Sequence, residues 1–382
     1  MLALEIVGPV YGTTGYDRHT REFTRALHRL GAPLQLSPMK GWSLPQRDFQ
    51  EDALFRELQK PRPTDLTLHF TMPTQCEPRA GRVNANYTMF EGDRIPAEWG
   101  RRAAEHALIV VPNETCRSAW LAGGVTREKL AIAPLAVDGA FFAGPAEPME
   151  LDVTLSHRPI PRPLRTYARR FLHIAELRPR KNLLGLLRTW ICATKPEDDA
   201  VLVVKSTCFV PPDRVAFEQD LRAMQERLGR GLEDAAPVVM LHSLFDDDQM
   251  RALYKAVTHY ISLSFGEGWD FPMMEAACCG LDLIAPRHSG YLSYLGEDDA
   301  LWVPAKLEPA SFEGSSGRAD RRFFAGIQWW RPDEHAAIEA VRIAVRGERA
   351  RQSPQRRIMH DFTWENAARK LLEALGPIAP ES

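Results

Sequence analysis

The stretch from Tyr260 to Ala285 restricts the fold more than any other part of this sequence. Apolar runs at its two ends, residues 260–263 and 281–285, predict two strands. Between them, Pro272 suits the first turn of a helix and Gly280 suits the position just past its end. The order of strand, loop, helix and strand is typical of an open α/β sheet, in which ligands bind beyond the carboxyl ends of the strands.

The length of the chain and its prolines indicate two such domains. A single hydrophobic core rarely serves 382 residues, so we expect two α/β domains of roughly 150 to 200 residues each. Five prolines between Gly144 and Pro163 interrupt any helix or central strand, which places the interdomain linker at about 143–165. The expected division is a first domain over 1–155, a second over 165–355 and a final helix over 356–382.

Composition and charge exclude several classes of protein. A net charge of −2 does not suit a surface that coats nucleic acid, so no nucleic-acid partner is expected. No apolar run is long enough to cross a membrane, and Glu5 interrupts the first apolar stretch too early for a signal peptide, which favours a cytoplasmic protein. The six cysteines form no C-x-x-C pair and lack matching histidine spacing, so neither a zinc site nor a disulfide framework is predicted. We interpret Asp246–Asp248 as the cap of a helix in preference to a metal-binding motif.

A glycine loop follows the first predicted strand, residues 3–7. Gly12, Thr13, Thr14 and Gly15 lead from this strand into a helix. A loop that opens a helix after a strand presents backbone N–H groups that can bind an anion. The spacing is not G-x-G-x-x-G, so the dinucleotide fingerprint is absent, and an ordinary turn is an equal alternative.

A basic turn follows the predicted strand at 170–175 and contains Arg178, Arg180 and Lys181. It opens a helix, where the dipole is already positive, so these cations are electrostatically misplaced unless a negative group lies opposite them. A diphosphate is such a group, because Arg and Lys bind phosphate oxygens strongly. A solvated charged turn is the alternative.

Two glutamates flank the loop of the Tyr260–Ala285 stretch: Glu267 within the loop and Glu275 in the first helical turn. The ordinary explanation is a tight turn eased by its glycines, with a carboxylate favoured at a helix start. The whole string from Ser264 to Gly280, however, resembles the Glu-x7-Glu signature of retaining glycosyltransferases of the GT4 family. In that family the first glutamate meets the donor sugar and the second holds the nucleotide ribose.

The resemblance implies a fold as well as a site. The expected fold is α/β of the GT-B type, with two doubly wound Rossmann-like domains facing a central cleft. The helix over 356–382 would cross back to the first domain. Lys181 with Asn182 resembles a Lys-Asn step of the family, whereas Glu176 stands where the family usually has Arg. This departure leaves Arg178 or Arg180 as the substitute.

The resemblance also assigns roles to individual residues. In the first domain, Glu91 stands near the place of a family histidine that faces the donor sugar, and His69 is a second option. The implied catalytic residues are Glu267, Lys181, Arg178 and Glu91. The implied donor-binding residues are Gly12, Thr13, Thr14, Gly15, Arg180, Lys205, Gly266, Gly268, Trp269 and Glu275.

The activity implied by the resemblance is transfer of a sugar from a nucleotide-diphosphate sugar to an acceptor hydroxyl. The reaction would retain the anomeric configuration and need neither a metal nor another cofactor. The acceptor, a saccharide, a lipid-linked molecule or a protein, is not encoded in a readable pattern, and ordinary surface charge explains Arg101 and Arg102 better than a membrane-facing patch. A nucleotide-sugar isomerase or hydrolase and a non-catalytic sugar-nucleotide-binding subunit are the alternatives.

Overall fold

The computed structural model describes residues 2–42, 46–151, 160–207, 211–312 and 318–380. The chain forms two compact units, one of Met1–Val137 with His360–Ser382 and one of Asp138–Met359. The first unit thus ends ahead of the proline-rich stretch, of which residues 152–159 lie outside the described part. Asp138 already belongs to the second unit because it caps α6 (Gly139–Ala143), and α6 packs against α10 (Phe271–Cys278).

The first unit is built on a six-stranded sheet whose strands are all parallel. Parallel strands that are covered on both faces consist of nearly continuous apolar residues, and the buried Leu108–Val111 strand is an example. The strand order reverses between β1 and β3, which makes their carboxyl ends a topological switch point. In spatial order the strands are β2 (Leu34–Pro38), β1 (Leu4–Gly8), β3 (Leu66–Phe70), β4 (Val83–Tyr87), β5 (Leu108–Val111) and β6 (Leu130–Ile132).

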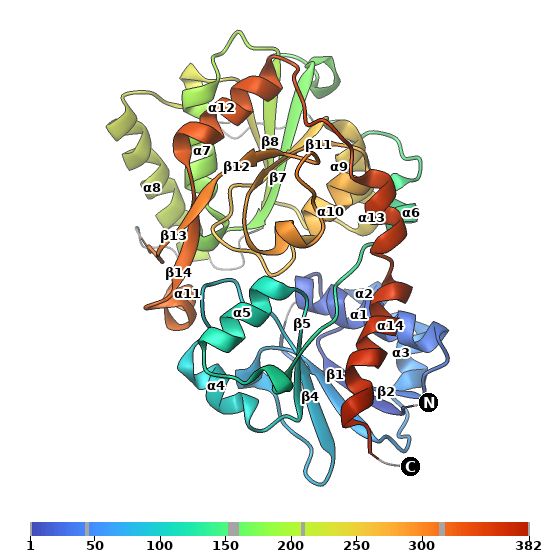
Figure 1. The fold of residues 1–382 in the computed structure, drawn as a ribbon. Coiled ribbons are helices and arrows are strands. Elements are labelled where there is room, and N and C mark those ends of the chain that lie inside the picture. Colours follow the sequence, from blue (N-terminus) through green and yellow to red (C-terminus); the bar gives the residue numbers. More distant parts are fainter. Residues whose placement is uncertain (1, 43–45, 152–159, 208–210, 313–317, 381–382) are drawn as a thin grey trace. The chain divides into compact units, whose positions relative to one another are not determined.

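Helices from both ends of the chain cover this sheet. The last helix, α14 (Trp364–Leu375), lies along α1 (Gly15–Arg29) in Figure 1, and the rings of Trp364 and Phe23 are 5.4 Å apart. Residues 360–380 are therefore part of the core of the first unit. The other helices of this unit are α2 (Arg47–Glu51), α3 (Ala53–Leu58), α4 (Ala97–Ala103) and α5 (Glu114–Ala122).

The second unit is built on another six-stranded parallel sheet. Read from β9, its order is that of a doubly wound nucleotide-binding sheet, with the reversal between β7 and β10. The basic turn follows β7 and the Glu267 loop follows β10, so the sheet brings both to the same switch point. In spatial order the strands are β12 (Leu301–Val303), β11 (Asp282–Pro286), β10 (His259–Ile261), β7 (Arg169–Glu176), β8 (Ala200–Thr207) and β9 (Val238–Leu241).

Two helices of the second unit begin at aspartate caps. Asp246 caps α9 (Asp247–Ala256) in a capping box, which confirms the interpretation of the Asp-rich triplet. Asp333 caps α12 (Glu334–Val345), which packs against α7 (Leu183–Ala193). The remaining helices are α8 (Pro211–Leu228), α11 (Arg318–Phe324) and α13 (Gln355–Asp361), the last of which spans the boundary of the units.

An antiparallel hairpin in the second unit was not expected from the sequence. Residues 328–332 form β14 (Gln328–Pro332), which pairs with β13 (Ala305–Pro309). Trp330 N–H donates to the carbonyl of Phe265, 2.9 Å away, so the hairpin is attached to the loop after β10. The two tryptophans of β14 favour a strand, and the helix begins only after Pro332.

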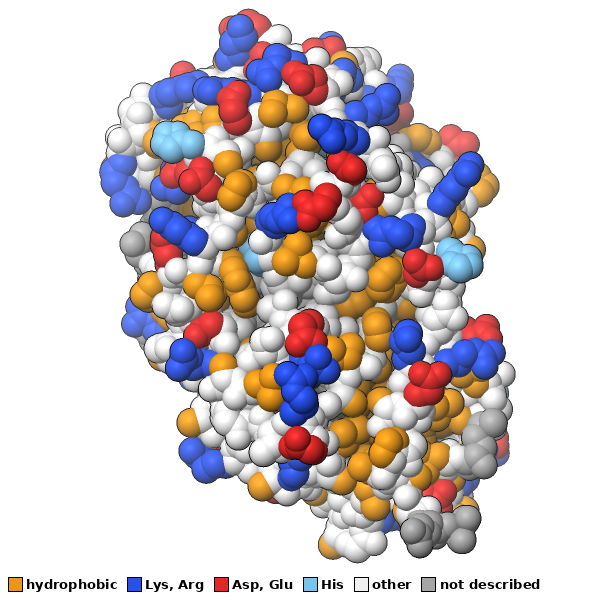
Figure 2. Space-filling model, in the orientation of Figure 1, with side chains coloured by type: hydrophobic (Ala, Val, Ile, Leu, Met, Phe, Trp, Pro, Cys, Tyr) orange, Lys and Arg blue, Asp and Glu red, His pale blue; other side chains and the backbone are white. Residues whose placement is uncertain are grey.

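Charges of both signs are mixed on the face drawn in Figure 2. Figure 2 shows Lys and Arg side chains intermingled with Asp and Glu on the visible face, as the small net charge suggests. Within the described ranges, no helix has both the length and the apolar character needed to cross a bilayer.

Candidate functional site

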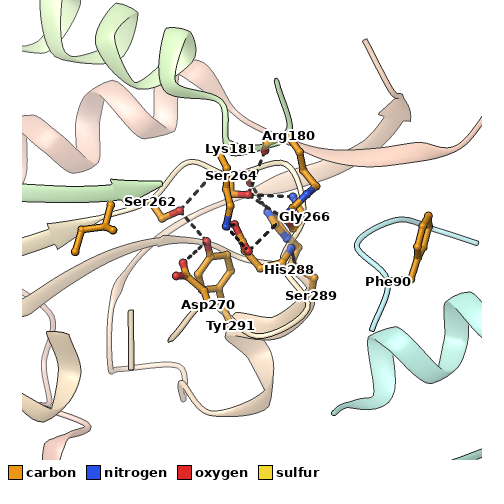
Figure 3. Close-up of polar contacts among 12 residues, drawn as sticks. Phe90, Arg180, Lys181, Ser262, Ser264, Gly266, Asp270, His288, Ser289 and Tyr291 are labelled. Atoms are coloured by element: carbon orange, nitrogen blue, oxygen red, sulfur yellow. Dashed lines mark hydrogen bonds and ion pairs between the residues drawn. The ribbon is translucent and has the colours of Figure 1, made fainter. Parts of the chain in front are cut away.

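The candidate site lies at the switch point of the second unit and is built from the loops after β7, β10 and β11 (Figure 3). Lys181 comes from the turn after β7, and Glu267 comes from the loop after β10. The Lys181 Nζ donates to both carboxylate oxygens of Glu267, at 2.7 and 2.8 Å. Arg180 Nη1 lies 3.3 Å from Oε2 of the same carboxylate. Lys181 and Glu267 are 86 residues apart in the sequence, and the pairing of the adjacent parallel strands β7 and β10 brings them together.

The Glu267 carboxylate is charged although it is buried. Its residue is only 5% exposed, and burial by itself would raise the pKa of the carboxyl group. The nearby Lys181 and Arg180 outweigh burial and hold the pKa of Glu267 well below its usual range. The two cations keep partial exposure, 20% for the Lys181 side chain and 16% for Arg180. The cluster therefore presents cationic side chains toward solvent over a buried anion.

Backbone contacts fix the basic turn against the loop after β10. The Arg180 carbonyl accepts from Phe265 N–H at 2.8 Å and from the Ser264 hydroxyl at 3.2 Å. The Arg180 guanidinium in turn donates to the Gly266 carbonyl. Asn182 has a left-handed backbone, with φ of 54°, and its side-chain amide donates to the Leu263 carbonyl at 2.8 Å. A short polar residue tolerates this conformation, which explains why Asn stands where glycine would also fit.

A third loop, after β11, closes around Glu267 from the other side. The Ser289 hydroxyl accepts from Glu267 N–H at 3.1 Å, and Gly290 N–H donates to the Glu267 carbonyl at 3.0 Å. A Cβ on Gly290 would lie only 3.0 Å from the Glu267 carbonyl oxygen and the Trp269 backbone, so glycine is needed for this close approach. His288 holds the Ser264 carbonyl at 2.9 Å, and burial lowers the pKa of its imidazole to about 4.

Asp270 is a site residue that the sequence analysis missed. It is 8% exposed and has a left-handed backbone, with φ of 69°, directly before α10. The Tyr291 hydroxyl donates to its carboxyl group at 2.9 Å and also lies 2.7 Å from the Ser262 hydroxyl. Burial and the nearby Glu267 carboxylate raise the pKa of Asp270. An Asp before a Pro-bearing helix start suggests an ordinary N-cap, and the sequence gives no sign of the left-handed backbone of Asp270 or of its bond with Tyr291.

Glu275 lies in α10 and is 2% exposed. The Tyr254 hydroxyl of α9 donates to its Oε2 at 2.7 Å, which fixes the orientation of the carboxylate. Lys205, near the end of β8, is 7% exposed, and its ammonium lies 5.0 Å from the ring centroid of Phe245. Burial lowers the pKa of Lys205, and the Glu275 carboxylate counteracts this effect. Lys205 and Glu275 are therefore two buried groups of opposite charge in the second unit, and the Glu275 charge acts on Lys205.

Some residues expected at the site have other partners. Arg178 Nε donates to Glu176 at 2.9 Å, so the unexpected glutamate engages the arginine next to it. Of the two arginine candidates, the structure brings Arg180 to Glu267 and directs Arg178 elsewhere. Trp269 is 2% exposed, and its indole N–H points to the Met274 sulfur at 2.7 Å, which is the behaviour of a core residue.

The glycine loop of the first unit has its own internal anion. The Asp17 carboxylate accepts from Gly12 N–H at 2.8 Å and from Thr14 N–H at 3.2 Å. Thr14 caps α1 in a capping box with the same aspartate. Thr13 and Gly15 are exposed. A backbone N–H that is bound to a carboxylate is a poor site for another anion, because the two would compete.

The two first-domain candidates, Glu91 and His69, lie in different surroundings. Glu91 is half-buried. Burial raises the pKa of the Tyr16 phenol, and the nearby Glu91 carboxylate raises it further. His69 is fully buried on β3, and its two ring nitrogens lie 3.4 and 3.1 Å from the carbonyls of Ala85 and Glu77.

Comparison with known proteins extends over the whole chain. No protein-family model and no curated protein sequence matches. Among solved structures, the chain is similar to HepE from Anabaena in complex with UDP and glucose, with a TM-score of 0.61, 11% identity and coverage of 99% of this chain and 100% of that one. It is similar to sucrose-phosphate synthase from Thermosynechococcus elongatus, with a TM-score of 0.62, 13% identity and 99% coverage of both chains.

A third similar structure is the UDP-forming α,α-trehalose-phosphate synthase from Burkholderia xenovorans, with a TM-score of 0.63 and 12% identity over 100% of both chains. At this level of identity the likeness concerns the fold. These structures are glycosyltransferases, and the fold expected from the resemblance is confirmed: the chain has the α/β GT-B fold with two parallel six-stranded sheets.

Proposed function

We propose that this chain is a retaining, metal-independent glycosyltransferase of the GT4 kind that uses a nucleotide-diphosphate sugar. The observation that carries the proposal is the contact of Lys181 and Arg180 with Glu267 at the switch point between β7 and β10. Ligands bind at such points in doubly wound sheets. The similar structures are of glycosyltransferases, and HepE was solved with UDP and with UDP-glucose, so UDP is the nucleotide we propose first.

The reaction needs positive charge at the leaving group. Cleavage of the bond between the sugar and the diphosphate leaves negative charge on the diphosphate and oxocarbenium character on the sugar. The Lys181 ammonium has three N–H donors, and the two carboxylate oxygens of Glu267 take two of them. The third donor is available for a phosphate oxygen. Preorganised cations at the developing charge are an effective way to stabilise a transition state.

The two glutamates would act on different parts of the donor. Glu267 keeps Lys181 and Arg180 in place and would accept hydroxyls of the donor sugar. Glu275 has two acceptor oxygens, one of which Tyr254 orients, and would take the ribose hydroxyls. Asp270, whose pKa burial and the Glu267 carboxylate raise to about 7, would hold the start of α10 through Tyr291 while adding only a partial charge beside Glu267 near neutral pH.

Donor binding is tested by a thermal-shift series with UDP, GDP, ADP and dTDP. A ligand at about 100 times its dissociation constant stabilises the folded state by about 2.7 kcal/mol. We expect UDP to raise the melting temperature most and to do so equally with EDTA present. A shift that requires magnesium would contradict the metal-independent part of the proposal, and no shift with any nucleotide would contradict the whole.

Glu267→Gln separates transfer from binding. The amide keeps the shape of the side chain but removes the charge that holds both cations and the sugar. We expect loss of sugar transfer with UDP binding retained. Incubation with the donor alone distinguishes the alternatives: release of a changed sugar at the full rate without an acceptor would indicate an isomerase or hydrolase. A variant with unchanged transfer would remove Glu267 from the mechanism.

A further inference from the structure

The first unit contains a buried cluster of His69, Cys76 and His106 that the glycosyltransferase site does not use. One ligand atom of each side chain lies within 4.8 Å of those of the other two, and all three residues are buried. They come from β3, from the segment after the short 3-10 turn Pro73–Gln75, and from the four residues between α4 and β5. The spacing of cysteines and histidines along the chain predicted no zinc site, because these three residues are far apart in sequence and meet only in the folded sheet.

The histidines of this cluster have lone pairs without partners. His106 Nδ1 lies 3.2 Å from the Arg102 carbonyl, so its N–H is directed there and Nε2 carries the lone pair. His106 is 2% exposed, and Nε2 has no hydrogen-bond partner among the described residues. Both ring nitrogens of His69 face backbone carbonyls, but a neutral imidazole can donate to only one of them. One His69 nitrogen is therefore also left with an unused lone pair.

A metal ion satisfies both lone pairs at once. Metal-bound histidines characteristically donate their other N–H to a backbone carbonyl, as His106 does to Arg102 and as His69 can do with either of the two carbonyls that its ring nitrogens face. A tetrahedral zinc ion places its nitrogen and sulfur ligands about 3.3–3.6 Å apart. The cluster must therefore contract by only about 1 Å.

We propose that His69, Cys76 and His106 bind a zinc ion, with water as the fourth ligand. One thiolate and two imidazoles are the donor set that zinc prefers over magnesium or calcium. The ion would clip the segment at 71–82 to β3 and to the end of α4. This segment is a loop of the first unit, and the clip would hold that loop in place. The proposal does not depend on the proposed glycosyltransferase function.

The test uses the full chain without a histidine tag, treated with EDTA and titrated with Co²⁺ as a spectroscopic substitute for zinc. We expect about one equivalent to bind with tetrahedral d–d bands and a thiolate-to-cobalt charge-transfer band. Cys76→Ser should remove the charge-transfer band, and both Cys76→Ser and His106→Gln should weaken zinc binding by at least about tenfold. The absence of stoichiometric binding, or unchanged binding by both variants, would overturn the proposal.

Cys116→Ser is the matched control. Cys116 is a buried cysteine of the same unit whose thiol donates to the Phe90 carbonyl at 3.4 Å. This variant should keep the full spectrum. Loss of the charge-transfer band in this variant would show that Cys116, and not Cys76, supplies the thiolate. Hydrogen exchange of the wild type needs no variant: zinc should increase protection in residues 71–82, and unchanged protection there would refute the clip.

Discussion

The two units share an architecture but use the loop after their first strand in opposite ways. Each has a six-stranded parallel sheet with one reversal of strand order. In the first unit the loop after β1 is a set of N–H groups, and Asp17 occupies two of them. In the second unit the loop after β7 carries Arg180 and Lys181, and Glu267 lies against both.

The two loops differ in the net charge that remains after each carboxylate has its partners. In the first unit, the Asp17 carboxylate is accompanied by one buried guanidinium, that of Arg21, which donates to the carbonyls of Val10 and Gly12. In the second unit, two cations face the Glu267 carboxylate, and Asp270, with its pKa raised to about 7, carries only a partial charge near neutral pH. The first loop is therefore satisfied internally, whereas the second retains a positive charge for an incoming anion. Similar sheets thus do not imply equal roles in binding a diphosphate.

The largest expected effect comes from removing the positive charge of the second unit. We expect Lys181→Ala to lower turnover by about 10² to 10³, because a preorganised partner of the leaving group is lost. The measurement is steady-state transfer from the donor found in the thermal-shift series. Circular dichroism should show an unchanged fold.

Arg178→Ala is the matched control for this variant. Arg178 comes from the same turn, but its guanidinium is held by Glu176. We expect a small change in turnover. Equal losses for the two variants would mean that the ion pair with Glu176 is broken in the working enzyme, and that the distinction between Arg178 and Arg180 drawn from the structure does not apply there.

An intermediate effect, on stability, is expected in the first unit at acid pH. His19 is fully buried among Phe23, Phe70 and Tyr87, neither ring nitrogen has a hydrogen-bond partner among the described residues, and burial lowers its pKa to about 3. A lowered pKa gives stability that is complete above the unfolded value of about 6.5 and is lost as the pH falls toward the folded value. At about pH 5 the loss from this residue is about 2 kcal/mol.

His19→Leu should therefore reduce the difference in unfolding free energy between about pH 7 and pH 5, measured with urea. His28→Leu in the same helix is the control, because His28 is exposed and hydrated in both states. We expect its pH dependence to match the wild type. If His19→Leu were as sensitive to acid as the wild type, His19 would not be the source.

The smallest expected effect comes from the glycine loop. Asp17→Ala removes the acceptor of two N–H groups and one side of a capping box, so we expect a loss of about 1 kcal/mol of stability. Glu365→Ala, which removes an exposed ion pair with Arg369 in α14, should cost less, about 0.3–0.5 kcal/mol. UDP affinity should not change in either variant. Tighter UDP binding by Asp17→Ala would show that the loop is an anion site that Asp17 blocks, and would break the contrast between the units.

The sequence by itself determined the elements of the site and their order. Pro272 and Gly280 bound the helix after Glu267 because a missing N–H and a left-handed backbone belong at those ends, and α10 with φ of 77° at Gly280 agrees. Asp246 caps α9 as predicted, for the same local reason. Local steric and capping preferences act over a few residues, so they can be read without knowledge of the fold.

Only the tertiary structure decided which side chains meet. Three features of the site depend on the fold around them. They are the choice between Arg178 and Arg180, the raised pKa of Asp270, and the burial of Trp269. The cluster of His69 with Cys76 and His106 has the same origin, since it joins three segments across one sheet. Electrostatic and lone-pair interactions act over a few ångströms in space, and the pairing of parallel strands, not the spacing of residues, sets those distances.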